Sequence, residues 1–445
     1  MKQIFIAGAG LSSTSLIQYL LGQSEKNNWN IVVGDYDISL AQQRIENHSN
    51  GRAIAFDVFD PEQRNDAIMQ SDIVVSMLPS SMHILLAEDC VIQGVNMVTA
   101  SYVSDDIAAL HEKAIEKGVL LLNEMGLDPG IDHMSAKKII DHIHQQDGEI
   151  ELFKSFCGGL VSKEFDNNPW NYKFTWNPRN VVLAGQKTAQ FKRNGLLKYI
   201  PYNQLFSRLE YIEIDNEGQF ECYANRDSLV YQSHYELKHT PTILRGTLRR
   251  PGFCKAWDVF VQLGMTDDSF EMLHLDTMTW REFTNSFLIF DNKKSVEEKL
   301  KTYLSLDDDV MEKLNWLGIF SNETIGLSKG SPAQVLQHLL EPKWRLEEGD
   351  KDMIVMQHIF DYKLNGSSHT LHSSLVVKGK DKTHTAMSMT VGLPVAIATE
   401  LILEGRITLK GVHIPVQSEI YTPVLDRLKD FDIDFVEKVY TNVAE

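Results

Sequence analysis

The sequence predicts an α/β protein that begins with a doubly wound parallel sheet. Three observations support this prediction: a glycine-rich turn after the first strand, an acidic residue at the end of the second strand, and apolar strands that alternate with helical patterns over residues 1–130. Alternation of this kind is typical of a parallel sheet with helices on both faces.

The first turn follows a strand expected over Lys2–Ala7 and reads Gly8-Ala9-Gly10-Leu11-Ser12-Ser13, a G-x-G-x-x-S pattern in which serine replaces the third glycine. Gly8 permits the tight turn, and Gly10 allows the backbone to approach a pyrophosphate. The N–H groups at the start of the following helix favour phosphate oxygens. The turn therefore predicts a dinucleotide cofactor.

The second strand, expected over Asn30–Gly34, ends at Asp35, which lies where the dinucleotide-binding pattern places an acid on the adenosine ribose, about 20 residues after the turn. A carboxylate there accepts hydrogen bonds from the ribose hydroxyls and repels a 2′-phosphate. The next residues are Tyr36, Asp37 and Ile38, without an Arg or Lys. We therefore expect NAD to be preferred to NADP.

Four further strands complete a sheet of six, with helical patterns between them. The strands are expected over Arg52–Phe56, Asp72–Met77, Asn96–Thr99 and Val119–Leu122, and the helices over Pro61–Met69, His83–Gln93 and Asp105–Lys117. The segments Asp57-Val58, Leu78-Pro79 and Ala100-Ser101-Tyr102 follow three of these strands. Ligands of open α/β sheets bind at such strand ends.

The segment Val119–His133, VLLLNEMGLDPGIDH, runs from an apolar strand into a turn with two glycines and a proline, and a helix pattern follows from Met134. The segment places four polar side chains near the turn, namely Glu124, Asp128, Asp132 and His133. Packing alone rarely requires so many polar groups there, so the segment predicts chemistry. The alternative is a plain strand–helix turn with surface acids.

Composition and charge are typical of a large soluble enzyme. The chain has 445 residues, 43% of them hydrophobic, and a net charge of −18, which argues against nucleic acid or an anionic membrane as a partner. The four cysteines lack metal-ligand spacing or a disulfide framework. No membrane span or targeting segment is visible, so we expect a cytoplasmic protein without a metal.

Beyond residue 133 the pattern indicates a mixed sheet with helices to one side. Strands are expected over Ile150–Phe156, Val181–Leu183, Phe220–Tyr223, Ser228–Tyr231 and Thr242–Leu248, a helical region over Ala256–Leu340, a hairpin of Met353–Tyr362 and His369–Val377 around Asn365-Gly366, and a helix over Thr390–Glu404 that ends before Gly405. Asn-Gly is a strong hairpin signal.

Arginines cluster in this second part, at Arg179, Arg226 and Arg245. Arginine is suited to bidentate recognition of carboxylates, so the set suggests a substrate with several carboxylates. The alternative is salt bridging to the abundant Asp and Glu.

Nine motifs, in chain order, resemble the family of L-glutamate-forming saccharopine dehydrogenases, also called saccharopine reductases. They are GAGLSS, LPSSMH, TASYVS, NEMGLDPGIDH, CGGL, NPWNYKFTW, NRDS, RGTLRRPGF and VGLPVAIAT. The resemblance implies a Rossmann domain over residues 1–130, completed by about 388–445, a saccharopine-binding α/β domain over 131–255 and 345–387, and a small helical domain over 256–344.

The resemblance implies that saccharopine is oxidised to an imine, which water splits into glutamate and 2-aminoadipate 6-semialdehyde. It places the substrate at Ser101, Tyr102, Asp128, Asn225, Arg226 and Asp227, to which we add Arg245 and Thr247. It places the pyrophosphate at Gly10, Leu11 and Ser12, and the nicotinamide near Met125 and Gly126. The full set expected at the cofactor is Gly8, Gly10, Leu11, Ser12, Ser13, Asp35, Tyr36, Asp57, Val58, Leu78, Pro79, Ala100, Ser101, Met125 and Gly126.

The acid–base group has four candidates, Asp128, Tyr102, His133 and Cys157. The amine must lose a proton before it can release hydride, and attack by water needs a base. Asp128 fits best in type and position, although it could only bind the substrate's ammonium. For Cys157 the alternative that we favour is a packed small residue, and His133 could cap or pack. We take Asp128, Tyr102 and Cys157 as the catalytic candidates.

Cofactor choice and substrate leave alternatives open. Fungal members of the family carry an Arg after the second strand, which suits NADP, whereas this chain has Asp35-Tyr36. Reductive condensation on polyamines, as in carboxynorspermidine dehydrogenases, uses the same imine chemistry, but the arginines argue against a cationic substrate. A non-catalytic NAD-binding sensor is the third reading. A homodimer that binds small molecules is the expected assembly.

Overall fold

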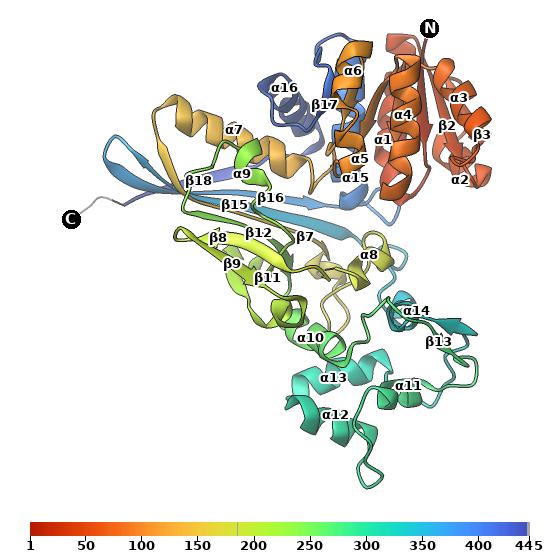
Figure 1. Cartoon of the computed structure of the whole chain (residues 1–445), viewed down its shortest axis with the longest axis vertical. Coiled ribbons are helices and arrows are strands. Elements are labelled where there is room, and N and C mark those ends of the chain that lie inside the picture. The colour runs from red at the N-terminus through yellow and green to blue at the C-terminus, as the bar shows by residue number, and fades with distance from the viewer. Residues whose placement is uncertain (185, 443–445) are drawn as a thin grey trace. The chain divides into compact units, whose positions relative to one another are not determined.

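The computed structural model describes residues 1–184 and 186–442. The chain forms two compact units (Figure 1). The first comprises Met1–Ile150, Tyr362–His369 and Leu375–Glu445, and the second comprises Glu151–Asp361 and Thr370–Ser374. The three-domain division expected from the sequence stays a prediction.

The first unit contains a parallel sheet of seven strands in the order β17-β6-β5-β4-β1-β2-β3. The strands are β1 (Lys2–Ala7), β2 (Trp29–Asp35), β3 (Gly51–Ala55), β4 (Ile73–Ser76), β5 (Asn96–Thr99), β6 (Leu120–Leu122) and β17 (Gly411–His413). All six predicted strands form, so the doubly wound parallel sheet is confirmed. The seventh, β17, has only three residues, too few to show a periodic pattern.

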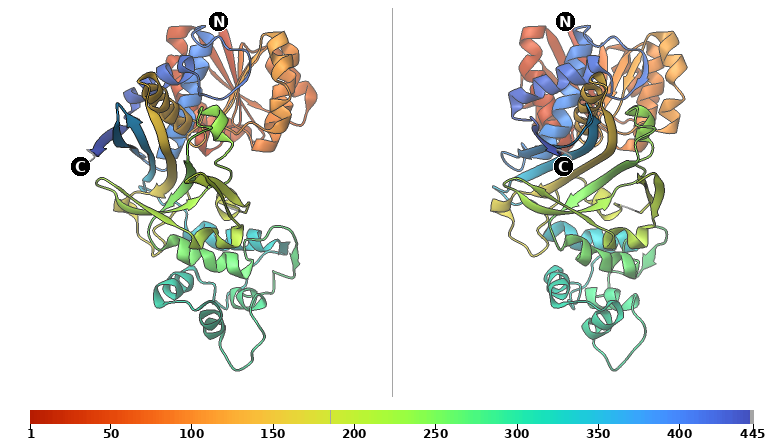
Figure 2. Two further views of the ribbon diagram at one scale, coloured as in Figure 1. Left: turned by 60° about the vertical axis from the view of Figure 1, so that its left-hand side comes forward. Right: turned by 90° about the vertical axis from the view of Figure 1, so that its left-hand side faces the viewer.

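Helices cover both faces of this sheet (Figure 2, left). The helices of the first unit are α1 (Thr14–Asn27), α2 (Ile38–Ile45), α3 (Pro61–Met69), α4 (His83–Gln93), α5 (Asp105–Ala108), α6 (His111–Lys117), α7 (Ile131–Gln145), α15 (Ala386–Leu403) and α16 (Ser418–Leu428), with the 3-10 turns η1 (Leu11–Ser13), η2 (Ser80–Met82) and η5 (Lys429–Phe431). The single helix expected over Asp105–Lys117 is interrupted, because the Leu110 N–H bonds to the Ile107 carbonyl in a tighter turn. Helix α7 begins three residues before the predicted Met134.

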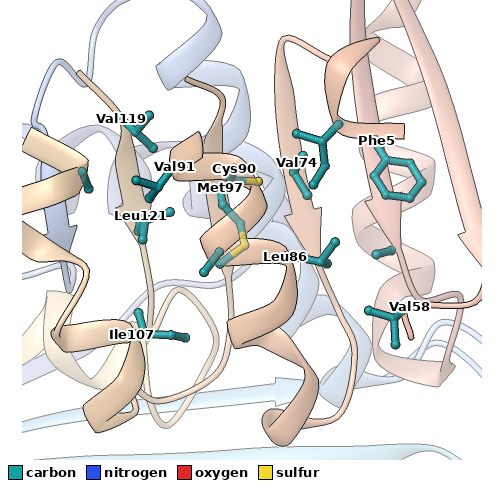
Figure 3. Close-up of a cluster of buried hydrophobic side chains, with 14 of the residues drawn as sticks. Phe5, Val58, Val74, Leu86, Cys90, Val91, Met97, Ile107, Val119 and Leu121 are labelled. Atoms are coloured by element: carbon teal, nitrogen blue, oxygen red, sulfur yellow. The ribbon is translucent and has the colours of Figure 1, made fainter. Parts of the chain in front are cut away.

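Apolar side chains from the strands and from α4 to α6 form one core cluster on the first sheet (Figure 3). Phe5, Val74 and Leu121 come from strands, and Leu86 and Cys90 come from α4. All five side chains have 0% exposure. This core holds α4 against the carboxyl ends of the central strands, where the polar residues described below are located.

Helix α15 is long and apolar enough to cross a membrane by length and composition alone, yet 78% of its apolar window is buried inside the structure. It packs against α1 and η1 of the first unit. We therefore interpret α15 as a core helix, as the sequence predicted for the apolar segment before Gly405.

The second sheet is mixed and has the order β10-β11-β12-β7-β15-β16-β18, with β8 paired to both β12 and β9. Its strands are β7 (Glu149–Val161), β8 (Ala189–Arg193), β9 (Leu196–Ile200), β10 (Glu210–Ile214), β11 (Gly218–Ala224), β12 (Thr242–Arg249), β15 (Asp352–Leu364), β16 (Ser367–Lys378) and β18 (Val436–Asn442). The hairpin between β15 and β16 turns at Asn365-Gly366, both with positive φ, as predicted.

The remaining elements of the second unit are mostly helical. They are α8 (Pro178–Val182), α9 (Tyr231–His234), α10 (Phe253–Leu263), α11 (Trp280–Ser286), α12 (Val296–Leu304), α13 (Asp308–Leu317), α14 (Pro332–Lys343), η3 (Lys163–Phe165), η4 (Tyr202–Ser207) and the short pair β13 (Met272–Leu273) and β14 (Lys329–Gly330). The helical region predicted from Ala256 is confirmed and begins three residues earlier, at Phe253.

Two strand predictions were wrong, and local capping explains both. Val181–Leu183 overlaps helix α8, because Pro178 stands in its first turn and the Asn177 side chain caps the Arg179 N–H. Ser228–Tyr231 forms a turn that leads into α9, because the Asp227 carboxylate accepts a hydrogen bond from the Leu229 N–H at 2.8 Å. Such side-chain bonds compete with strand pairing.

Candidate functional site

The glycine turn is shaped for close backbone approach. Gly8 has a φ of +103°, and a Cβ there would lie 2.8 Å from the Met77 carbonyl oxygen, so a side chain is excluded by both conformation and space. A Cβ at Gly10 would meet no atom within 4 Å, which leaves its backbone open to a ligand. The turn therefore fits a pyrophosphate, as the sequence predicts.

Sequence reasoning missed the glycine that packs behind this turn. A Cβ at Gly392 of α15 would lie 2.9 Å from the Leu16 nitrogen and 3.1 Å from the Ser12 oxygen. Gly392 thus provides the close helix packing that the third glycine of a dinucleotide-binding turn usually gives. The VGLP segment was the signal, since a glycine inside an apolar helix usually has a packing reason.

Asp35 is fixed to the glycine turn. Its Oδ2 accepts a hydrogen bond from the Ala9 N–H at 2.7 Å, and its Oδ1 accepts one from the Asp37 N–H at 3.0 Å. Tyr36 is 84% exposed, and Asp37 caps α2 by accepting from the Ser39 N–H. Two carboxylates therefore stand where the adenosine ribose is expected. The sequence did not reveal Arg44, a buried basic residue whose Nε donates to the Ala9 carbonyl at 3.4 Å.

A chain of three polar side chains lies at the ends of β4 and β5. His83 Nδ1 is 2.7 Å from Ser76 Oγ, and His83 Nε2 is 2.7 Å from Ser101 Oγ. Ser76 has 0% exposure and His83 1%. Burial lowers the pKa of His83 to about 4, so the ring is neutral near pH 7. Sequence reasoning selected Ser101 but missed His83 and Ser76, although His83 is part of the LPSSMH motif.

The turn after β6 brings Tyr102 and Asp128 together, with the Tyr102 hydroxyl 3.4 Å from Asp128 Oδ1. Both side chains reach the same strand-end region from different loops. Asp128 is thus placed beside a second ionisable group, as a site for an amine or an acid–base step requires.

The other polar groups of this turn hold its shape. Glu124 has a φ of +59°; its Oε1 accepts from the Val103 N–H at 3.1 Å, and its Oε2 is 2.7 Å from His133 Nε2. Asp132 accepts from the Gly130 N–H at 2.6 Å. All three side chains are buried. Glu124, Asp132 and His133 therefore stabilise the turn through their own contacts.

The remaining cofactor candidates line the same strand ends. Asp57 Oδ1 accepts from the Phe59 N–H at 2.9 Å, and Val58 is buried. The segment Leu78-Pro79 leads from β4 into η2. The Met125 N–H bonds to the Thr99 carbonyl at 3.0 Å, and a Cβ on Gly126 would lie 3.1 Å from Ala100. The loops after β5 and β6 are thus tied to each other.

In the second unit, three candidates share one face of the sheet. Strands β7 and β12 pair in parallel with Thr247 opposite Cys157 and Arg245 opposite Ser155. Residues two apart on a strand point to the same face, so Cys157, Arg245 and Thr247 lie on one side. The Arg245 guanidinium stacks 4.0 Å from the centre of the Tyr231 ring and is 6% exposed.

The loop after β11 carries the other substrate candidates. The Asn225 N–H bonds to the Arg245 carbonyl at 2.8 Å, which fixes the loop to β12. Asp227 accepts from Gln190 Nε2 as well as from the Leu229 N–H. Arg226 is exposed and has a φ of +49°. The loop thus holds Arg226 in an unusual backbone conformation at the surface of the unit.

Other arginines of this unit have structural partners. Arg179 forms an ion pair with Asp268. Arg249 lies 5.1 Å from the Tyr172 ring centre and 5.3 Å from that of Phe253, and it is 5% exposed. Arg250 donates to the Glu217 carbonyl at 2.8 Å. The salt-bridge reading is therefore correct for Arg179.

No group of three or more His, Cys, Asp or Glu side chains that could hold a metal ion occurs in residues 1–184 and 186–442. The four cysteines are buried thiols that form no disulfide bond in the part of the chain that the structure describes. Burial raises the pKa of Cys222 to about 12 and raises that of Cys90 further, so these thiols are poor nucleophiles.

Comparison with known proteins gives matches along the whole chain. Residues 4–122 match the model of the saccharopine dehydrogenase NADP binding domain, and residues 126–433 match that of the saccharopine dehydrogenase C-terminal domain. The chain is 33% identical to the saccharopine dehydrogenase [NADP(+), L-glutamate-forming] of Schizosaccharomyces pombe, with 99% of both chains covered. It is 33% identical to the α-aminoadipic semialdehyde synthase of Arabidopsis thaliana, covering 93% of this chain and 41% of that protein.

A solved structure agrees with this assignment. The apo saccharopine dehydrogenase (L-Glu forming) of Saccharomyces cerevisiae superposes with a TM-score of 0.89 at 31% identity, covering 99% of this chain and 100% of the other. At this identity and coverage the similarity extends to sequence and fold together.

Proposed function

The chain belongs to the saccharopine dehydrogenase family, and we propose that it catalyses the L-glutamate-forming reaction of that family with NAD in preference to NADP. The family predicted from the nine motifs is thereby confirmed. The enzyme is a nicotinamide-dependent oxidoreductase that acts on the CH–NH group of saccharopine in lysine metabolism. The observation that carries this function is the match to L-glutamate-forming dehydrogenases along 99% of both chains.

The residues at the turn after β6 fit the proton steps of this reaction. A nicotinamide held near Met125 and Gly126 would supply the hydride acceptor for the carbon beside the secondary amine. Asp128 holds or removes the proton of that amine, and Tyr102, 3.4 Å from Asp128 Oδ1, orients the carboxylate and exchanges protons with it. Water then attacks the imine carbon, and the C–N bond breaks to give glutamate and 2-aminoadipate 6-semialdehyde.

Residues of β12 and of the loop after β11 are the proposed partners of the substrate's carboxylates. Arg226 and Arg245 bind them with planar guanidinium groups, and Asn225, Asp227 and Thr247 complete the polar set. Cys157 lies beside Thr247 on the same face of the sheet. It would therefore be next to a substrate bound by Thr247. The exposure of Arg226 supports its role, since its side chain is accessible to a ligand.

The preference for NAD rests on the fixed position of Asp35. Both of its carboxylate oxygens are held by backbone N–H groups, from Ala9 and Asp37. The carboxylate therefore cannot turn away from a 2′-phosphate without losing two hydrogen bonds, and Asp37 adds a second negative charge. The matched family model and the fungal relatives are named for NADP, so the preference proposed for this chain differs from the cofactor in those names.

An absorbance assay at 340 nm with saccharopine and either cofactor tests the function. We expect reduced dinucleotide and free glutamate, with a higher kcat/KM for NAD. Turnover of carboxynorspermidine instead would indicate a polyamine enzyme, and binding of NAD without turnover would indicate a sensor. The proposal includes a reducing, cytoplasmic compartment, which four cysteines without a disulfide bond favour, and a homodimer.

A further inference from the structure

The hydrogen-bonded series Ser76–His83–Ser101 has a donor-to-acceptor direction. This direction follows from the buried end of the series, at Ser76. A neutral imidazole has one N–H donor and one acceptor nitrogen. If Nδ1 carried the proton, it would donate to Ser76 Oγ, and the Ser76 hydroxyl proton would then need another acceptor. In the part of the chain that the structure describes, the Ser76 hydroxyl has only His83 Nδ1 as a hydrogen-bond partner, and its side chain has 0% exposure.

The other tautomer satisfies every group. Ser76 donates its hydroxyl proton to Nδ1, and the protonated Nε2 donates to Ser101 Oγ. The hydroxyl proton of Ser101 then cannot bond to the imidazole and points away from it. A buried donor without an acceptor costs free energy, whereas a hydroxyl that donates its one proton needs no further acceptor. The buried Ser76 hydroxyl therefore selects the tautomer of His83.

Ser101 is well placed to use that proton. Its side chain is partly exposed, unlike those of Ser76 and His83, and it follows β5 at the ligand-binding edge of the sheet. Its backbone is fixed from both sides, because its N–H bonds to Thr99 Oγ1 at 3.3 Å and its carbonyl accepts from the Glu124 N–H at 3.0 Å. A fixed hydroxyl with a defined proton is a directional donor.

We propose that His83 is a positioning residue that makes the Ser101 hydroxyl a donor to an acceptor oxygen of the bound ligand. The acceptor is a carboxylate oxygen of saccharopine or the carboxamide oxygen of the nicotinamide. This inference rests on the proposed function for the identity of the ligand, but the direction of the chain does not depend on it. His83 acts through Ser101 and does not touch the reacting atoms.

The direction is tested without any activity. Protein labelled with ¹⁵N at histidine rings gives spectra that distinguish the two tautomers, and the His83 signals are assigned by their loss in His83→Gln. We expect the Nε2-protonated form from pH 6 to pH 8, and conversion to a tautomer mixture in Ser76→Ala. An Nδ1-protonated ring in the wild type would overturn the proposal, even if saccharopine is turned over normally.

Kinetics test the consequence. Glutamine can present its amide N–H near the position of Nε2, whereas leucine fills the space without a donor. We expect His83→Leu and Ser101→Ala to lower kcat/KM about 10-fold, as for one lost directional hydrogen bond, and His83→Gln to stay within about 3-fold of the wild type. A raised KM for saccharopine alone indicates its carboxylate as the acceptor, and a raised KM for the dinucleotide alone indicates the carboxamide.

Leu86→Ala is the matched control, because Leu86 is fully buried on the same helix and its side chain has no hydrogen-bonding group. It should lower the melting temperature while both KM values stay unchanged. Equal kinetics for His83→Leu and His83→Gln in folded protein would reduce His83 to a packing role. Absence of turnover in the wild type would instead reject the proposed function.

Discussion

At the carboxyl edge of the first sheet, polar side chains are held by backbone amides and by each other, whereas around β12 of the second unit arginines are held by aromatic rings and acidic neighbours. The Asp35 and Glu124 carboxylates each accept a hydrogen bond from a backbone N–H, and the Ser101 hydroxyl bonds to the His83 ring. Arg245 and Arg249 instead lie against tyrosine and phenylalanine rings. Backbone bonds set an atom's position, while ring contacts mainly hold a charge in place. The contacts in the first region therefore fix the positions of polar atoms, whereas those in the second mainly stabilise charged groups.

Four experiments test this comparison, and the largest effect is expected for His133→Ala. His133 and Glu124 form a buried contact of 2.7 Å, with 0% and 7% exposure. Removing His133 leaves the Glu124 carboxylate without this partner, and the loss of one member of a buried pair costs about 3–5 kcal/mol. Urea denaturation should show this loss of unfolding free energy, with kcat preserved in the folded fraction.

His142→Ala on the same helix is the control for helix propensity. His142 is exposed, so its replacement should change the unfolding free energy by less than about 0.5 kcal/mol. If His133→Ala is as mild as the control while kcat collapses, His133 belongs to the chemistry and not to the fixed turn.

The second effect is a pH dependence of stability caused by His83. Its pKa is lowered by burial from 6.5 to about 4, so the unfolded chain binds a proton below pH 6.5 that the folded chain takes up only near pH 4. Stability therefore falls as the pH drops from 6.5 to 4, by up to about 3 kcal/mol from this group. Denaturation at several pH values should show a steeper loss in the wild type than in His83→Gln, and parallel curves would contradict it.

The third effect concerns the second region, where the contacts mainly stabilise charged groups. Arg226→Ala should lower kcat/KM for saccharopine, because a substrate carboxylate is left unpaired. The loss of transition-state stabilisation should be about 2–4 kcal/mol, with KM for the dinucleotide unchanged. Arg226→Lys keeps the charge but loses the planar fork and should recover only part of the loss.

Arg179→Ala provides the matched control in the same unit, because Arg179 is already paired with Asp268. Its substrate KM should stay at the wild-type value. An unchanged KM in folded Arg226→Ala would return Arg226 to the same surface role as Arg179.

The sequence predicted those parts of the fold and site that depend on local pattern. The six parallel strands, the glycine turn and Asp35 follow from periodicity and fixed spacing, so they could be recognised. Val181–Leu183 could not, because the helix there depends on an Asn177 cap that outweighs β-branched residues.

His83, Ser76 and Gly392 were missed for a different reason. Their roles arise from contacts across strands or helices, with Ser76 and Ser101 brought to one imidazole from separate strands, and Gly392 against residues near the N-terminus. Such contacts over long sequence separations leave no periodic signal in a single sequence.

The smallest effect, a change of cofactor preference, tests the first region at its most exposed point. In the Asp35→Ser, Tyr36→Arg double variant, the carboxylate is removed and a guanidinium stands where Tyr36 is 84% exposed. A charge-assisted contact to a 2′-phosphate contributes about 1–3 kcal/mol, so the ratio of kcat/KM for NADP over NAD should rise by about 5- to 150-fold. Asp37→Asn is the control, since asparagine keeps the α2 cap and removes a neighbouring charge; its ratio should rise far less. A wild type that uses NADP as well as NAD, together with equal ratios in the two variants, would mean that Asp35 only ties the glycine turn to β2 and that charge at the ribose does not select the cofactor.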